Sequence, residues 1–301
     1  MSPARYGILA TFALLVGGAS AESALAQEPA PRPELGDPHP FRLPETERFV
    51  LDNGLTVTLA PYGSTPKATV RLVLPTGSVD ESQDEVWLAA LTGDLLQEGT
   101  ATRTAEQIAT EAASMGGSLS LGVAADRTTA GGDVLEEFAP ELVRLTADVL
   151  RNPAFPGSEL ERLRSNRMRQ LTVALQQPGT LTQVAFLERL YPDHPYGRPL
   201  PTREVLEAHS LEDIRAFWSE HYGPEGGHLY VSGRFDADAV RAAVEEALGS
   251  WAGRSPAPPP VGQAAAAPGT VFVARPGASQ STLYLGLPVV DPSHRDWVTL
   301  Q

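Results

Sequence analysis

The sequence contains no cysteine among its 301 residues. Disulfide bonds, thiolate-bound metals, a cysteine nucleophile and a lipid-modified cysteine are therefore excluded. Basic residues are also scarce, because 23 Lys and Arg stand against 37 Asp and Glu, which gives a net charge of -14 and a pI of about 4.9. Nucleic-acid binders need clustered Lys and Arg to displace counterions. The charge balance argues against nucleic acid as a partner.

Long apolar runs are absent after residue 27, and no later segment approaches the roughly 20 apolar residues that span a bilayer. The mature chain is therefore predicted to lack a membrane span. Before that point, Arg5 precedes an apolar run over residues 6–19, and Ala24-Leu25-Ala26 offers small residues for cleavage. This pattern predicts a secretory signal peptide over residues 1–26, with cleavage near Ala26 and a periplasmic or secreted product.

Composition divides the rest of the chain. Residues 27–47 are rich in proline and acid, which favours an extended lead-in, and residues 253–269 have the Pro- and Ala-rich composition of a linker. Between them, residues 48–252 are long enough for one domain with its own core. Residues 270–301 hold two strand patterns, too little to bury a core alone, and are predicted to begin a second, truncated repeat.

Hydrophobic periodicity predicts the elements of the domain. In residues 48–61, two apolar runs flank Asn53-Gly54, which predicts a hairpin whose tight turn takes positive backbone angles from Asn and Gly. Further strands are expected within 67–78, as a pair within 118–134, and within 227–235. Helices are expected within 87–100, where a glycine stops the first of them, and at 104–115, 135–151, 158–177, 181–190, 211–221 and 236–248.

This succession of segments resembles the insulinase and pitrilysin family of zinc peptidases, in particular its short processing-peptidase-like members. The resemblance rests on "LDNGLTVTLAP", "LPTGSVDE", "WLAALTGDLLQEGT", "MGGSLSLGVAADRTT", "DHPYGRPL" and "HYGPEGGHLYVSGRF", spread over residues 48–251. It implies an α+β fold: a mixed, mostly antiparallel sheet with helices packed on one face, followed by the start of a second repeat of the same fold.

The family's chemistry uses H-x-x-E-H on one helix and a distant glutamate. Because "GLAHFLEHMLFKGT" of a typical member lines up with "WLAALTGDLLQEGT", the resemblance places the two histidine positions at Ala90 and Asp94, the base at Gly93 and the distant glutamate at Gln170. Alanine has no donor atom, glycine accepts no proton, and one carboxylate with one amide is a poor zinc site. No catalytic residue, no metal ligand and no zinc cofactor are expected.

A basic run follows in the helix that holds Gln170, with Arg162, Arg164, Arg167 and Arg169. Such a run is typical of a solvated face whose charges neighbouring acids satisfy. The alternative hypothesis is that Arg169 or Arg167 neutralises Asp94 and replaces the charge of the metal. Of the histidines, His194 is expected to be hydrogen-bonded in a loop, and His221 and His228 to form a surface pair.

The resemblance also identifies "GGSLSLGV", residues 116–123, as the strand whose edge pairs with an extended substrate in active relatives. Pairing through backbone groups does not depend on side chains, so Ser118, Leu119, Ser120 and Leu121 are the candidate peptide-binding residues. Many relatives have asparagine where Ser120 stands. The alternative is an ordinary strand that a partner or the second domain covers.

The resulting functional hypothesis is an exported peptidase-like subunit without its own zinc site. It pairs as a heterodimer with a zinc-bearing homologue, and the two chains enclose extended peptides. Two alternatives stay open: an active zinc metalloendopeptidase of the same family, and a stand-alone peptide-binding or scaffold protein.

Overall fold

The computed structural model of the protein describes residues 43–253, 269–287, 289–290 and 293–300. Within them, the strands are β1 (Glu47–Val50), β2 (Thr56–Pro61), β3 (Lys67–Leu74), β4 (Ser118–Val123), β5 (Thr128–Leu135) and β6 (His228–Gly233). They form one sheet in the order β1-β2-β6-β3-β5-β4. The β2–β6 pair is parallel and the other neighbours are antiparallel. The predicted mixed, mostly antiparallel sheet is confirmed.

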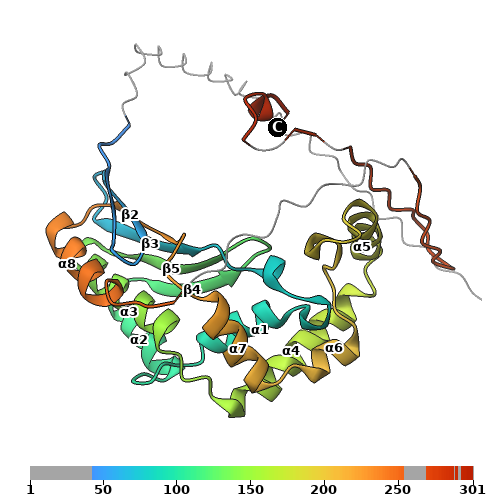
Figure 1. The fold of residues 1–301 in the computed structure, drawn as a ribbon, viewed down its shortest axis with the longest axis horizontal. Helices are drawn as coiled ribbons and strands as arrows, with labels where there is room; N and C mark the ends of the chain where they lie inside the picture. The colour runs from blue at the N-terminus through green and yellow to red at the C-terminus, as the bar shows by residue number, and fades with distance from the viewer. Residues whose placement is uncertain (1–42, 254–268, 288, 291–292, 301) are drawn as a thin grey trace, which may run out of the picture. The chain divides into compact units, whose positions relative to one another are not determined.

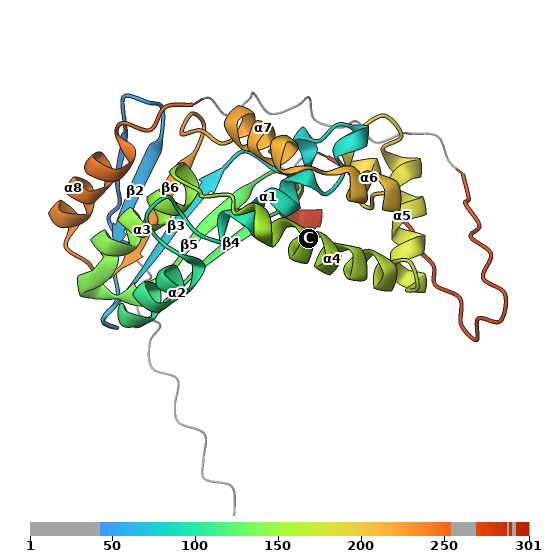
Figure 2. The ribbon, with the colours of Figure 1, turned by 90° about the horizontal axis from the view of Figure 1, so that it is seen from below.

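The helices are α1 (Leu88–Leu96), α2 (Ala105–Ser114), α3 (Ala139–Arg151), α4 (Gly157–Ala174), α5 (Pro178–Leu190), α6 (Arg203–Ala208), α7 (Leu211–His221) and α8 (Ala237–Leu248). Helices α1, α2, α3 and α8 lie on the same side of the sheet (Figure 1), as predicted. Helix α4 runs on past the sheet toward α5 (Figure 2). The periodicity missed α6, whose six residues are too short to show a pattern.

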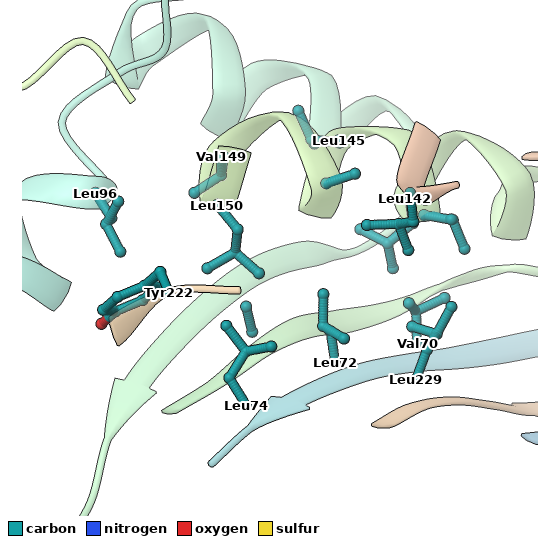
Figure 3. Packing of buried hydrophobic residues seen from close by; sticks show 14 of the residues in the cluster. Val70, Leu72, Leu74, Leu96, Leu142, Leu145, Val149, Leu150, Tyr222 and Leu229 are labelled. Atoms are coloured by element: carbon teal, nitrogen blue, oxygen red, sulfur yellow. The ribbon is translucent and has the colours of Figure 1, made fainter. Parts of the chain in front are cut away.

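The core lies between β3 and α3. Figure 3 shows Val70, Leu72 and Leu74 of β3 pointing toward Leu142 and Leu150 of α3, and each of these side chains is at most 1% exposed. The residues between them along β3 are partly exposed, so the strand alternates as its sequence predicts. Full burial of one such side chain contributes about 1.5–3 kcal/mol. This layer fixes the position of the sheet. Strand β4 forms one edge of that sheet, and α1 packs against β4.

The turn between β1 and β2 differs from the prediction. Gly54 has a positive φ of 87°, but Asn53 does not belong to the positive-φ residues. The Gly54 N–H donates to the carbonyl of Leu51 at 2.9 Å, so residues 51–54 form a tight turn in which Gly54 alone has a positive φ. The Asn53 side chain donates to the carbonyls of Leu248 (2.7 Å) and Trp251 (3.1 Å) and thereby ties this turn to the end of α8.

The strand patterns after the linker are also not realised as predicted. Residues 269–287 contain no assigned strand, and their apolar side chains Phe272, Leu283 and Leu285 are exposed. A strand needs a neighbour for its backbone hydrogen bonds, and these residues pair with none of the six strands. The predicted signal peptide 1–26, most of the lead-in 27–47 and linker residues 254–268 lie outside the described residues. Within the described ranges, no helix combines the length and hydrophobicity needed to cross a membrane.

Candidate functional site

Helix α1 carries the degenerate motif, and a buried carboxylate defines where it begins. Glu81 Oε1 accepts from the backbone N–H of Ala89 (2.8 Å), and Oε2 accepts from that of Trp87 (3.1 Å). Both N–H groups belong to the first turn, where no intrahelical acceptor exists. Burial raises the pKa of Glu81 to about 8, although these two hydrogen bonds favour the charged form. No sequence pattern marks Glu81, because its role depends on the chain folding back onto α1.

Trp87 precedes α1 in a strained conformation. Its φ is 74°, a left-handed value that favours glycine, and glycine is the residue of the typical member at this position. The indole Nε1 donates to the carbonyl of Pro199 at 3.0 Å. This bond fixes the tryptophan beside the helix that it introduces.

Gly93, at the position that the resemblance assigns to the general base, is buried against β4. A Cβ atom built on Gly93 would lie 2.5 Å from Cγ2 of Val123 and 3.1 Å from Cδ2 of Leu121. Carbon atoms in contact are about 3.5–4.0 Å apart, so no side chain fits without movement of β4 or rotation of Val123. The place where a glutamate side chain would begin is therefore filled by the edge strand.

Asp94 and Ala90 instead face α4, where Arg167 reaches both of them. Arg167 Nε donates to Asp94 Oδ2 at 2.7 Å, and Nη2 donates to Asp94 Oδ1 at 2.8 Å. Nη2 also donates to the carbonyl of Ala90 at 3.2 Å, and Nη1 donates to Gln170 Oε1 at 3.3 Å. One guanidinium group thus contacts residues 90, 94 and 170, the three positions that the resemblance assigns to zinc ligands, and its bond to Gln170 lies within α4 itself.

The periodicity of α4 explains why Arg167 takes this place. Leu160, Leu163 and Leu171 are its buried residues, and Arg167 falls on the same helical face. Arg169 lies two residues further and bonds to Asn166 on the exposed side. Of the two arginines in the hypothesis, Arg167 is the one beside Asp94. Arg162 is half exposed and pairs with Glu98, as expected of a solvated basic run. Arg164 is only 22% exposed, and it donates to the carbonyl of His209 at 2.7 Å as well as pairing with Glu161.

The residues present do not fit zinc. Asp94 is the one charged donor among the three positions, and both of its oxygens already accept from a cation. A backbone carbonyl at residue 90 and a neutral amide at residue 170 complete the set, whereas zinc sites are built from imidazole, thiolate and carboxylate. Within the part of the chain that the structure describes, no group of three His, Cys, Asp or Glu side chains is placed to hold a metal ion.

The candidate peptide-binding strand β4 lies at the edge of the sheet. Ser118 and Ser120 are exposed, and Leu119 and Leu121 pack on the core. The turn that follows is closed by a bond from Ala124 N to the carbonyl of Arg127. Because hydrogen-bonded and non-bonded pairs alternate between antiparallel strands, Leu119 and Leu121 direct their N–H and C=O groups away from β5. These groups form the outer edge.

The three histidines have separate partners. His194 Nδ1 accepts from the backbone N–H of Tyr196, which confirms a hydrogen-bonded loop residue. His221 packs on the ring of Phe217, with ring centroids 4.4 Å apart, and His228 Nε2 lies 2.8 Å from Thr58 Oγ1. The predicted pairing of His221 with His228 is wrong, because the second histidine enters β6 and bonds to the neighbouring strand.

Comparison with protein families gives two matches. Residues 57–202 match "Insulinase (Peptidase family M16)", and residues 209–301 match "Peptidase M16 inactive domain". The second match begins two residues before α7.

Similar curated proteins are zinc proteases by name. An uncharacterized zinc protease of Mycobacterium leprae is 31% identical over 215 residues, which are 70% of this chain and 48% of the relative. One of Rickettsia bellii is 27% identical over 201 residues, 66% of this chain and 49% of the relative. The chain therefore spans about half the length of these relatives.

Solved structures share the fold. A protease from Helicobacter pylori superposes with a TM-score of 0.68 at 21% identity, over 75% of this chain and 55% of the other. A peptidase M16 inactive domain from Pseudomonas fluorescens gives 0.64 at 24% identity, over 70% and 52%. The two family matches and the 31% identical relative show that the chain belongs to the insulinase family of peptidases, peptidase family M16.

Proposed function

We propose that this chain is an exported, non-catalytic peptidase subunit that holds extended peptides along the outer edge of β4. The observation that carries the proposal is the contact of Arg167 with Ala90, Asp94 and Gln170, because it puts a guanidinium where the family's metal chemistry takes place. The hydrolytic step then has to come from another chain, so the proposed partner is a zinc-bearing homologue of the same family.

Peptide binding is supported by the backbone of β4. Strand addition at an edge uses main-chain N–H and C=O groups, so it survives the loss of catalytic side chains. The outer groups of Leu119 and Leu121 suit this pairing, and Gly93 brings α1 close beneath the same strand. A bound peptide would lie beside α1 without meeting a nucleophile.

Peptide binding is tested by strand geometry. The probe is a fluorescein-labelled decapeptide of alternating Thr and Val with Lys at both ends, whose positive charge suits a chain of net charge -14. In strand addition, every second peptide amide bonds to β4. N-methylation of the amides that bond to β4 is expected to weaken binding at least about tenfold, the equivalent of about 1.4 kcal/mol. A peptide that is N-methylated at the alternate amides should bind as tightly as the unmodified peptide. Equal sensitivity to both sets of N-methylations would contradict the proposal.

The location is tested with single cysteines, which the cysteine-free sequence makes unique labels. A fluorophore on Ser120→Cys reports on β4, and one on Val50→Cys reports on β1, the opposite edge of the sheet. The peptide should change the emission at residue 120 and leave the emission at residue 50 unchanged. A response at residue 50 alone would move the site to the other edge.

An active zinc peptidase is the second candidate, and the names of the relatives favour it. Purified chain that contains stoichiometric zinc and cleaves an unfolded peptide, with loss on chelation, would establish this candidate. The third candidate is a stand-alone scaffold. Co-expression with a homologue that contains H-x-x-E-H distinguishes it from the proposed subunit. A subunit should form a stable complex that is active when the second chain is intact, whereas a scaffold should elute alone.

A further inference from the structure

Arg167 of α4 lies on the face packed against α1, where it bonds to Asp94 and to the carbonyl of Ala90. Its side chain is 21% exposed, and that of its partner Asp94 is 28% exposed. A charge withdrawn from water to this degree is destabilising unless it is paired. The arginine is paired through both nitrogens that face Asp94, in the parallel two-bond geometry that is the strongest arrangement of a carboxylate with a guanidinium.

Two further donors of Arg167 are also used within the degenerate motif. Nη2 reaches the carbonyl of Ala90, and Nη1 reaches the side-chain oxygen of Gln170. These four hydrogen bonds run from one cation on α4 to two residues of α1 and to its own helix. A metal ligated from both helices would join α1 to α4 in the same way.

We propose that Arg167 is a built-in cation that replaces the metal of the family and holds α1 against α4 without it. The substitutions in the motif then form one set with Arg167: a carboxylate at residue 94 to pair with it, a small residue at 90 that leaves room for it, and an amide at 170 that accepts from it. The chain is metal-independent because its site is filled by its own side chain.

Occupation of the site by Arg167 predicts a different result from loss of the zinc ligands alone. If only the ligands were lacking, the triple substitution Ala90→His, Asp94→His and Gln170→Glu would restore zinc binding. If Arg167 occupies the position, the restored ligands meet a fixed positive charge, and zinc stays excluded until Arg167 is also replaced. Gly93 is left unchanged in these variants, because a side chain there would collide with Val123.

The experiment measures bound zinc by mass spectrometry after equilibration of folded protein with one equivalent of ZnCl2. The triple variant is compared with the same variant carrying Arg167→Leu and with the same variant carrying Arg162→Leu. Arg162 is the matched control, because it is also on α4 and also pairs toward α1, through Glu98, but away from the motif. We expect close to one zinc with Arg167→Leu and at least about tenfold less in the other two.

Equal zinc in the triple variant and in its Arg167→Leu derivative would overturn the proposal. Absence of zinc from both would also overturn it, since something other than the guanidinium would then exclude the metal. A second measurement uses single substitutions in the natural sequence. Asp94→Ala and Arg167→Ala should each raise the equilibrium constant for unfolding several-fold. The double variant should be no less stable than the less stable of the two single variants. Additive effects of the two substitutions would show that the pair does not act as a unit.

Discussion

Gly93 of α1 lies so close to Val123 of β4 that a Cβ atom would come within 2.5 Å of the valine Cγ2. Glycine inside a helix costs about 1 kcal/mol relative to alanine, so a glycine here has to be explained by what surrounds it. The close approach of α1 to the edge strand is that explanation.

The first prediction concerns this contact. Gly93→Ala should destabilise the protein by about 1–2 kcal/mol, because the overlap with Val123 outweighs the gain in helix propensity. The measurement is urea unfolding followed by circular dichroism. In a Val123→Ala background the same substitution should become neutral or stabilising.

Gly179 of α5 is the matched control for this prediction. A Cβ atom there would meet nothing within 4 Å, so Gly179→Ala should be neutral or stabilising by up to about 1 kcal/mol. If Gly93→Ala stabilised the protein as Gly179→Ala does, the packing of α1 on β4 would be looser than described.

The second prediction is a pH dependence from Glu81. Its pKa is raised to about 8 by burial, whereas the unfolded chain titrates near 4.5. Between these values the folded protein keeps a proton that the unfolded chain releases. The free energy of unfolding should therefore fall as pH rises from 4.5 to 8, by at most about 1.4 kcal/mol per pH unit, and Glu81→Gln should flatten this slope.

The slope is the quantity to compare, because Glu81→Gln also turns an amide NH2 toward a backbone N–H and lowers stability at every pH. Urea unfolding at half-unit steps of pH gives it directly. The pKa of Asp80 is raised by burial too, so part of the slope should remain. Asp84→Asn, at an exposed neighbour, serves as the control, and an identical loss of slope there would contradict the assignment to Glu81.

The third prediction concerns Tyr196, whose hydroxyl donates to Asp126 in the turn after β4. Burial and this hydrogen bond raise the pKa of Tyr196 to about 12, so the phenol stays protonated at neutral pH. Tyr196→Phe should cost about 1–2 kcal/mol and should have no further effect in an Asp126→Ala background. Tyr62→Phe, at a residue that is 61% exposed, is the control and should be neutral.

The fourth prediction tests the role of Asn53. Asn53→Ala removes bonds to the carbonyls of Leu248 and Trp251 at the end of α8 and should cost about 2 kcal/mol. Asp52→Ala, at the exposed neighbour, should change stability by less than about 0.5 kcal/mol. Thermal unfolding monitored by calorimetry separates the two. Equal effects would mean that the turn itself, and not its link to α8, limits stability.

The sequence by itself determined the family, the kind of fold and the loss of the catalytic motif. Alternating apolar residues define β3 because a strand exposes every second side chain, and the capping pairs Thr104–Gln107 and Ser210–Asp213 mark α2 and α7 because their bonds are local. The identities of residues 90, 93, 94 and 170, aligned with the motif of a typical member, predict that the family's zinc ligands are missing.

Only the tertiary structure decided which groups replace what was lost. Arg167 and Arg169 are equally basic in sequence, and the packing of α4 on α1 turns only the first toward Asp94. Glu81 became a helix cap, and Asn53 a tie to α8, through contacts between segments that are 8 and 195 residues apart. Local propensity records the bonds that a residue makes with its neighbours along the chain, whereas these roles arise from neighbours in space.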